Sequence, residues 1–142
     1  MPLPAPGGPS RISLIVVASA LAFRQRVIPL DVLLAHWPIA VNLLADVMLD
    51  TLHWSGGNTS LDALAVGLPL VTLPGQFMRG RQSYAMLRMV GVEELIAKDP
   101  DDYVRIAVRL GRDRPWRESI SSRIRAGAGV LFEDAKPIAA LQ

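Results

Sequence analysis

The stretch that decides the fold covers residues 45–75 and reads ADVMLDTLHWSGGNTSLDALAVGLPLVTLPG. Two short apolar runs within it, 46–49 and 69–73, are typical of buried strands. Between them, residues 50–60 form a loop rich in Gly, Ser and Asn, and residues 61–66 favour a helix that ends at the following glycine. A strand, a helix and a second strand in this order predict a βαβ unit with parallel strands.

The same alternation continues on both sides of this stretch. Asp99 is a favoured N-cap residue and Pro100 suits the first helical position, so we expect a helix to begin there. Pro38 fits the helix predicted over 33–44 only if it lies at the helix start. The sequence therefore predicts an α/β fold in which helices flank a parallel sheet. Strands are predicted over 12–16 (whose alanine-rich continuation could be helical) and 26–30, helices over 33–44, 82–89, 100–110, 115–124 and 132–141, and a helical turn over 93–97.

The composition is that of one globular domain, since 51% of the 142 residues are hydrophobic. Lysine and arginine number 15 against 13 acidic residues, an excess too small to indicate a nucleic-acid-binding protein. Cysteine is absent, which excludes disulfides and thiolate metal sites and fits a reducing, cytoplasmic location. The sequence has no spacing typical of metal ligands, so we expect neither a metal nor a cofactor.

The apolar run over residues 12–23 is the part of the chain most like a membrane segment. It is shorter than the about 20 apolar residues that span a bilayer, and arginines follow it, so no membrane association is expected. Arg11 in front of the run and the small residues within it also allow a secretory signal peptide. A buried strand or helix is the favoured interpretation.

Gly56 and Gly57 lie in the loop that precedes the helix of the central stretch. Free backbone N–H groups and the helix dipole favour an anion at a helix start, and glycines let the backbone approach a phosphate closely. Asp62, which we place in the first turn of that helix, could accept a hydrogen bond from a ribose hydroxyl. These features make the loop a candidate phosphate site.

The same residues also allow an interpretation without a ligand. Asn58, Thr59 or Ser60 could simply cap the helix, because all three are favoured N-cap types. Asp62 could serve only to complement the helix dipole, and the two glycines could form only a turn. The local chemistry leaves both interpretations open.

Four blocks of the chain carry a family likeness: ADVMLDT (45–51), GGNTSLDALAVGLPLVTLPG (56–75), GRQS (80–83) and GVEELIAKDPDDYVRIAVRLGRD (91–113). Together, at their spacing, they resemble the C-terminal catalytic lobe of the O-linked N-acetylglucosamine transferase (SPINDLY-type) glycosyltransferases, especially the bacterial members with tetratricopeptide repeats. The resemblance implies a GT-B fold of two Rossmann-like lobes, with the donor bound in the cleft mainly by the C-terminal lobe. Residues 26–142 would be part of that nucleotide-sugar-binding lobe, and 1–25 a leader and poorly matching segment.

The resemblance also implies which residues bind the donor. In that family the loop before the helix holds the diphosphate of UDP-N-acetylglucosamine, and an acid in the first turn of the helix holds the ribose. Gly57, Asn58 and Thr59, next to Gly56, match the phosphate-contacting positions, and Asp62 matches the ribose-binding acid. Animal members have His-Thr-Thr in place of Gly57-Asn58-Thr59, so this chain departs from the family pattern there.

Three further side chains are candidates near the same loop. Arg81 matches a family position near the donor, and a guanidinium suits a phosphate, although a solvated helix start is the alternative. His53 could contact the donor, but a solvated side chain is the favoured interpretation. Trp54 could form a wall for a sugar or base, or could pack under the loop. The sequence assigns no catalytic residue.

The resemblance implies transfer of N-acetylglucosamine from UDP-N-acetylglucosamine to Ser or Thr of a protein acceptor, without a metal. The residues that precede the matching blocks are too few for a second lobe. We therefore expect the chain alone to be a fragment or a truncated product that lacks the N-terminal lobe. Two alternatives stay open: a transferase that uses UDP-glucose and modifies Asn, and a non-catalytic nucleotide-sugar-binding or interaction module.

Overall fold

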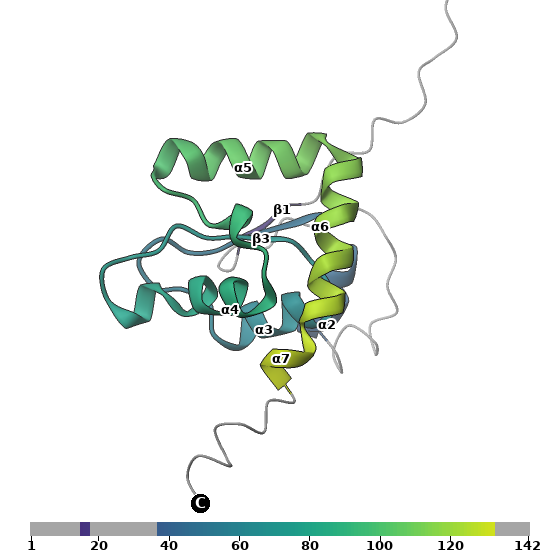
Figure 1. The fold of residues 1–142 in the computed structure, drawn as a ribbon, viewed down its shortest axis with the longest axis horizontal. Coiled ribbons are helices and arrows are strands. Elements are labelled where there is room, and N and C mark those ends of the chain that lie inside the picture. Colours follow the sequence, from purple (N-terminus) through teal and green to yellow (C-terminus); the bar gives the residue numbers. More distant parts are fainter. Residues whose placement is uncertain (1–14, 18–36, 133–142) are drawn as a thin grey trace, which may run out of the picture.

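The computed structural model describes residues 15–17 and 37–132, and Figure 1 shows how their helices and strands are arranged. The η elements are short 3-10 helices. In chain order the elements are β1 (Ile15–Val17), α2 (Trp37–Leu44), β2 (Val47–Leu49), α3 (Asn58–Ala65), β3 (Leu70–Val71), η1 (Met78–Gly80), α4 (Gln82–Val90), η2 (Glu93–Leu95), α5 (Pro100–Arg112), α6 (Arg114–Gly127) and α7 (Gly129–Phe132).

The three strands form one parallel sheet in the order β1-β2-β3. Met48 in the central strand is paired with Leu70 in β3. A single parallel bridge between Thr72 and Ile96 extends the sheet beyond β3. Helix α3 connects β2 to β3, and α4 connects β3 to the bridge at Ile96. The described residues therefore confirm the predicted α/β fold with a parallel sheet.

Helices cover both faces of this sheet. Helix α5 lies along one face, while α3 and α4 lie on the other side, and α6 runs past one end of the layers (Figure 1). Because α6 contacts α3, α4 and α5, it closes the core at that end. The core is apolar, and its largest side chains are at most 2% exposed: Met48, Leu64, Leu70, Leu87, Leu95, Leu110, Ile120 and Ile124.

Several helix starts lie where the sequence predicts them. Asp99 is the N-cap of α5 and accepts a 2.8 Å hydrogen bond from the backbone N–H of Asp102, with Pro100 as the first helical residue. Pro115 lies in the first turn of α6. The starts of α5 and α6 were predictable because a proline suits the first turn of a helix and Asp99 caps α5 beside it. The helix predicted over 33–44 is described from Trp37, with Pro38 in its first turn, and residues 33–36 lie outside the described residues.

The start of α3 differs from the prediction. The helix begins at Asn58 rather than at residue 61, and its N-cap is Gly57, which has no side chain to bond the first turn. The interpretation that Asn58, Thr59 or Ser60 caps the helix is therefore wrong. Ser60 is instead the third residue of α3, and its hydroxyl contacts that of Ser83, far along the chain.

Four other predicted elements need correction or lie partly or wholly outside the described residues. The helical turn predicted over 93–97 is the shorter η2, because Ile96 leaves it to pair with Thr72. The strand predicted over 12–16 appears as β1, and the terminal helix predicted from residue 132 is preceded by α7. The strand predicted over 26–30 and the rest of the terminal helix lie outside the described residues. Within 15–17 and 37–132, no helix is both long and apolar enough to cross a membrane.

Candidate functional site

The loop that follows β2 is organised by the carboxylate of Asp50, which is 3% exposed. Its Oδ1 atom accepts hydrogen bonds from the backbone N–H groups of Thr51 (3.1 Å) and Gly56 (2.8 Å). Its Oδ2 atom accepts from the hydroxyls of Ser55 (2.8 Å) and Thr72 (2.7 Å). Hydrogen bonds to an ionised acceptor are the strong ones, so these four donors fix the path of the loop from β2 towards α3.

Three buried serines join this loop to two helices. Ser55 lies in the loop, Ser60 in the first turn of α3 and Ser83 in the first turn of α4, and each is at most 2% exposed. The Oγ atom of Ser83 lies 2.8 Å from the Oγ atoms of both other serines. The Ser55 hydroxyl also accepts a 2.9 Å hydrogen bond from the Ser83 N–H and so caps α4 from a distant loop. The starts of α3 and α4 are thus held together at the carboxyl end of the sheet.

The start of α3 has the features expected of an anion site. Its N-cap makes no side-chain hydrogen bond, and the carbonyl of Gly57 accepts from the N–H groups of Ser60 and Leu61, both at 3.1 Å. The N–H groups of Asn58 and Thr59 come earlier in the first turn, where a helix leaves its donors without intrahelical partners. Both side chains are exposed. The helix dipole favours negative charge at this point.

Gly56 allows the loop to lie directly on the helix start. A Cβ atom there would stand 2.5 Å from the Ser60 hydroxyl and 2.7 Å from the Thr59 hydroxyl. Among the described glycines, only Gly67 and Gly91 have positive φ, so the requirement at Gly56 is close approach and not a left-handed turn. The interpretation of the glycine pair as a turn alone is therefore incomplete.

The two charged candidates, Arg81 and Asp62, lie on different helices. Arg81 is the N-cap of α4, and its guanidinium donates a 3.0 Å hydrogen bond to the carbonyl of Gly75 and lies 4.5 Å from the ring centroid of Tyr84. These contacts disfavour a freely solvated Arg81. Asp62 lies beyond the first turn of α3, since that turn holds no acid, so its predicted place in the first turn is wrong because the helix begins earlier. Its role at a ribose stays a prediction.

The start of α4 also lies close to Gly57, the N-cap of α3. A Cβ atom at Gly57 would stand 2.9 Å from the Oε1 atom of Gln82, the first residue of α4. The structure therefore brings Gly56, Gly57, Asn58 and Thr59 together on one loop and helix start, with the beginning of α4 beside them. The donor contacts of these residues stay predictions.

Large apolar side chains are exposed in the loops at this end of the sheet. Trp54 is 70% exposed, and Phe77 and Met78, at the start of η1, are 63% and 82% exposed. Trp54 therefore does not pack under its loop. His53 is exposed, as its favoured interpretation predicted.

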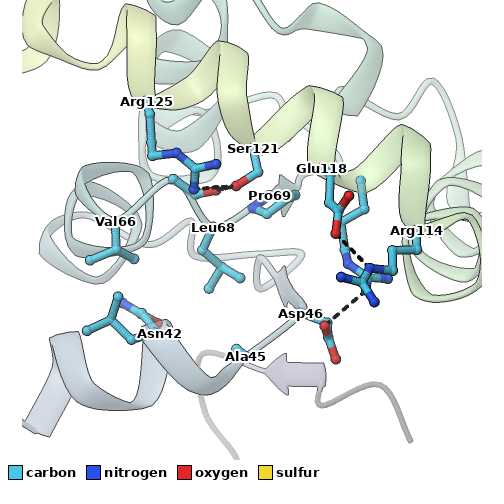
Figure 2. Close-up of a pocket in the computed structure, with 13 residues that line it drawn as sticks. Asn42, Ala45, Asp46, Val66, Leu68, Pro69, Arg114, Glu118, Ser121 and Arg125 are labelled. Atoms are coloured by element: carbon cyan, nitrogen blue, oxygen red, sulfur yellow. Dashed lines mark hydrogen bonds and ion pairs between the residues drawn. The ribbon is translucent and has the colours of Figure 1, made fainter. Parts of the chain in front are cut away.

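A pocket of about 290 Å³ lies at the opposite end of the sheet, beside the residues that precede β2 and β3. Figure 2 shows Asp46, which precedes β2, and Pro69, which precedes β3, on its wall. Arg117 of α6 also lines it and forms a 3.2 Å ion pair with Asp46. Ligands of open α/β sheets bind beyond the carboxyl ends of the strands, so this pocket is not the predicted donor site.

Tyr103 of α5 connects the other face of the sheet to the same loop. Its hydroxyl donates a 2.7 Å hydrogen bond to the carbonyl of Asp50. Burial, together with the nearby Asp50 carboxylate, raises the pKa of Tyr103 from 10.0 to about 12. The phenol is therefore held in its neutral form as a donor.

We expect the free energy of unfolding to fall as the pH rises from 10 to 12, because the unfolded chain loses the Tyr103 proton first. Below this window both states hold the proton and the contribution of Tyr103 is complete. Urea unfolding across this pH range should show a smaller fall for Tyr103→Phe than for the wild type. Equal falls in the two proteins would contradict the raised pKa of Tyr103.

The sequence alone did not single out Asp50, Ser55 or Ser83. An acidic residue directly after a buried strand was the signal for Asp50, whereas Ser55 and Ser83 are 28 positions apart and no local pattern links them. In the described part of the chain, no three His, Asp or Glu side chains come together as metal ligands.

A loop and a helix start at the carboxyl end of a parallel sheet are the arrangement of a Rossmann-like α/β lobe. The model of one family, glycosyl transferase family 41, matches residues 3–134. The chain belongs to glycosyl transferase family 41. This match crosses the boundary predicted between residues 25 and 26, which stays a prediction.

Relatives and a solved structure agree with the family match. The UDP-N-acetylglucosamine–peptide N-acetylglucosaminyltransferase of Caenorhabditis elegans is 47% identical over 81 residues, which are 57% of this chain and 7% of that protein. A probable enzyme of the same name, SPINDLY, from Arabidopsis thaliana is 33% identical over 90 residues, 63% of this chain and 10% of that protein. A mutant O-GlcNAc transferase of Thermobaculum terrenum superposes with a TM-score of 0.66 at 38% identity, over 72% of this chain and 20% of that one.

These likenesses confirm the predicted resemblance to the C-terminal lobe of O-GlcNAc transferase (SPINDLY-type) enzymes and its Rossmann-like α/β fold. The chain spans a tenth or less of the length of these two relatives and a fifth of the solved chain. Its own ligand and any activity therefore have to be argued from its residues.

Proposed function

We propose that this chain is the donor-binding lobe of an O-GlcNAc transferase-type glycosyltransferase and that it binds UDP-N-acetylglucosamine. The observation that carries the proposal is the start of α3, where the N–H groups of Asn58 and Thr59 follow an N-cap without a side-chain bond. The family membership and the names of the relatives support the choice of ligand. The diphosphate would lie at the α3 start, and the ribose near Asp62.

The chemistry of this site would be electrostatic. When the bond between the sugar and the diphosphate breaks, negative charge grows on the departing UDP. Backbone N–H groups and the positive end of the α3 dipole are already oriented towards that charge, so they stabilise it without rearrangement. Arg81, anchored on Gly75 and Tyr84, would add a positive charge beside the same loop.

Calorimetry with UDP tests the donor site directly. We expect the wild-type chain to bind UDP and Asp62→Ala to bind about tenfold more weakly, because a hydrogen bond to a charged group is lost. Asp101→Ala is the matched control, since it removes an exposed acid from α5 and should leave the affinity unchanged. A wild-type chain that binds no UDP would refute the donor site, and equal affinities of wild type and Asp62→Ala would remove Asp62 from it.

The sugar and the acceptor are further parts of the proposal. We propose N-acetylglucosamine as the sugar and Ser or Thr of a protein as the acceptor in the complete enzyme, in a cytoplasmic setting that the lack of cysteine supports. The change from His-Thr-Thr to Gly57-Asn58-Thr59 supports UDP-glucose, with transfer to Asn, as the second candidate. Competition of UDP-N-acetylglucosamine and UDP-glucose against bound UDP separates the two. A chain that binds either sugar nucleotide but transfers no sugar, even when combined with an N-terminal lobe, would be a binding module.

A further inference from the structure

The three buried serines described above form a chain of hydroxyls that ends on the Asp50 carboxylate. A hydroxyl has one proton to donate, and an ionised carboxylate can only accept. The Ser55 hydroxyl donates to Asp50, and the Oγ atoms of Ser55 and Ser83 lie 2.8 Å apart. The Oγ atoms of Ser60 and Ser83 also lie 2.8 Å apart, and either can donate. The three hydroxyls thus form a continuous chain from Ser60 through Ser83 and Ser55 to Asp50.

Ser83 is the member of this chain that joins α4 to the loop and to α3. Its N–H donates to the Ser55 hydroxyl, and its own hydroxyl forms hydrogen bonds with the hydroxyls of Ser55 and Ser60. Arg81 and Gln82 directly precede it, and Gln82 is the residue that lies beside Gly57. The position of Ser83 therefore determines the spacing between the start of α4 and the start of α3.

We propose that Ser83 is a positioning residue for the donor site, and that its hydroxyl holds the two helix starts at the spacing that the UDP diphosphate requires. This inference rests on the proposed function, because it assigns a role within the same site. Hydrogen bonds in such a chain polarise one another, and the buried surroundings make an unpaired hydroxyl costly. Removal of the middle hydroxyl would leave the 0% exposed Ser60 without its partner and let the two helix starts move apart.

Ser83→Ala tests this role, with Ser121→Ala as the matched control. Ser121 lies on α6, at the end of the sheet opposite the candidate donor site. Its hydroxyl donates a 2.6 Å hydrogen bond to the carbonyl of Gly67. Both variants lose one serine hydroxyl and its hydrogen bonds, so both are expected to unfold at a lower urea concentration than the wild type. Calorimetry with UDP, well below both unfolding transitions, then separates a loss of stability from a loss of position.

We expect Ser83→Ala to bind UDP about tenfold more weakly than the wild type, because phosphate contacts depend on placement within a fraction of an ångström. Ser121→Ala should bind UDP as the wild type does. Wild-type affinity in Ser83→Ala, or an equal loss in both variants, would overturn the positioning role and leave the donor site standing. A wild-type chain that binds no UDP would instead overturn the proposed function, and the positioning role with it.

Discussion

Asp50→Ala is expected to lower the free energy of unfolding by about 3 kcal/mol or more, because each buried donor left without an acceptor costs about 1–3 kcal/mol. The substitution removes the acceptor of the Gly56 N–H and of the Ser55 and Thr72 hydroxyls at once. A small domain is typically stable by only about 5–15 kcal/mol, so the change should be large in urea unfolding. A loss within about 0.5 kcal/mol of zero, the range of ordinary surface substitutions, would contradict the role of Asp50.

Asp50→Asn is the informative companion variant. Its amide oxygen can still accept from the backbone N–H of Gly56, and its NH₂ group faces the hydroxyls of Ser55 and Thr72, which can rotate and accept. We therefore expect an intermediate loss of stability. If Asp50→Asn were as unstable as Asp50→Ala, the negative charge and not the number of hydrogen bonds would be what holds the loop.

Gly127→Ala is expected to destabilise the chain by about 1–3 kcal/mol, as overpacked sites do. A Cβ atom at Gly127 would lie 2.7 Å from the carbonyl oxygen of Val90, which is a backbone atom and cannot turn aside. Gly127 ends α6 and Val90 ends α4, so the two helices would have to separate. The sign is notable because Gly→Ala within a helix normally stabilises by about 0.5–1 kcal/mol.

Gly129→Ala provides the control for this prediction. Gly129 is the first residue of α7, and no atom other than those of its chain neighbours and of its own helix backbone lies within 4 Å of its Cβ position. Its urea midpoint should equal or slightly exceed that of the wild type. If Gly127→Ala proved as stable as Gly129→Ala, the close contact between α4 and α6 would not be a constraint on this sequence.

The fold could be predicted from the sequence wherever its signals were local. The start of α5 was predictable because Asp99 caps the helix by a hydrogen bond to Asp102, only three positions away. The start of α3 was not, because its N-cap is a glycine and the first turn is held by contacts from α4 instead. The turn at η2 ended early for a similar reason, since Ile96 pairs with β3 across the sheet.

For the candidate site, too, the local features were predictable from the sequence and the long-range contacts were not. Two adjacent glycines and a following helix allowed an anion-binding loop as one of two interpretations, and the structure has a helix start there with no side-chain cap. The sequence could not show that Asp50 and Ser83 hold this loop, because their contacts join residues up to 28 positions apart. It also left open where Trp54 points, because an indole suits a buried and an exposed position equally well.

The exposure of Trp54 makes it a fluorescent probe that the chain already contains. A solvent-exposed indole emits at long wavelength, and its emission moves to shorter wavelength when a ligand or another protein surface covers it. The chain has two other tryptophans, and Trp37→Phe together with Trp116→Phe would leave Trp54 as the single emitter. Titration of that variant would then report, without any label, whether a molecule that binds the chain arrives at this loop or elsewhere.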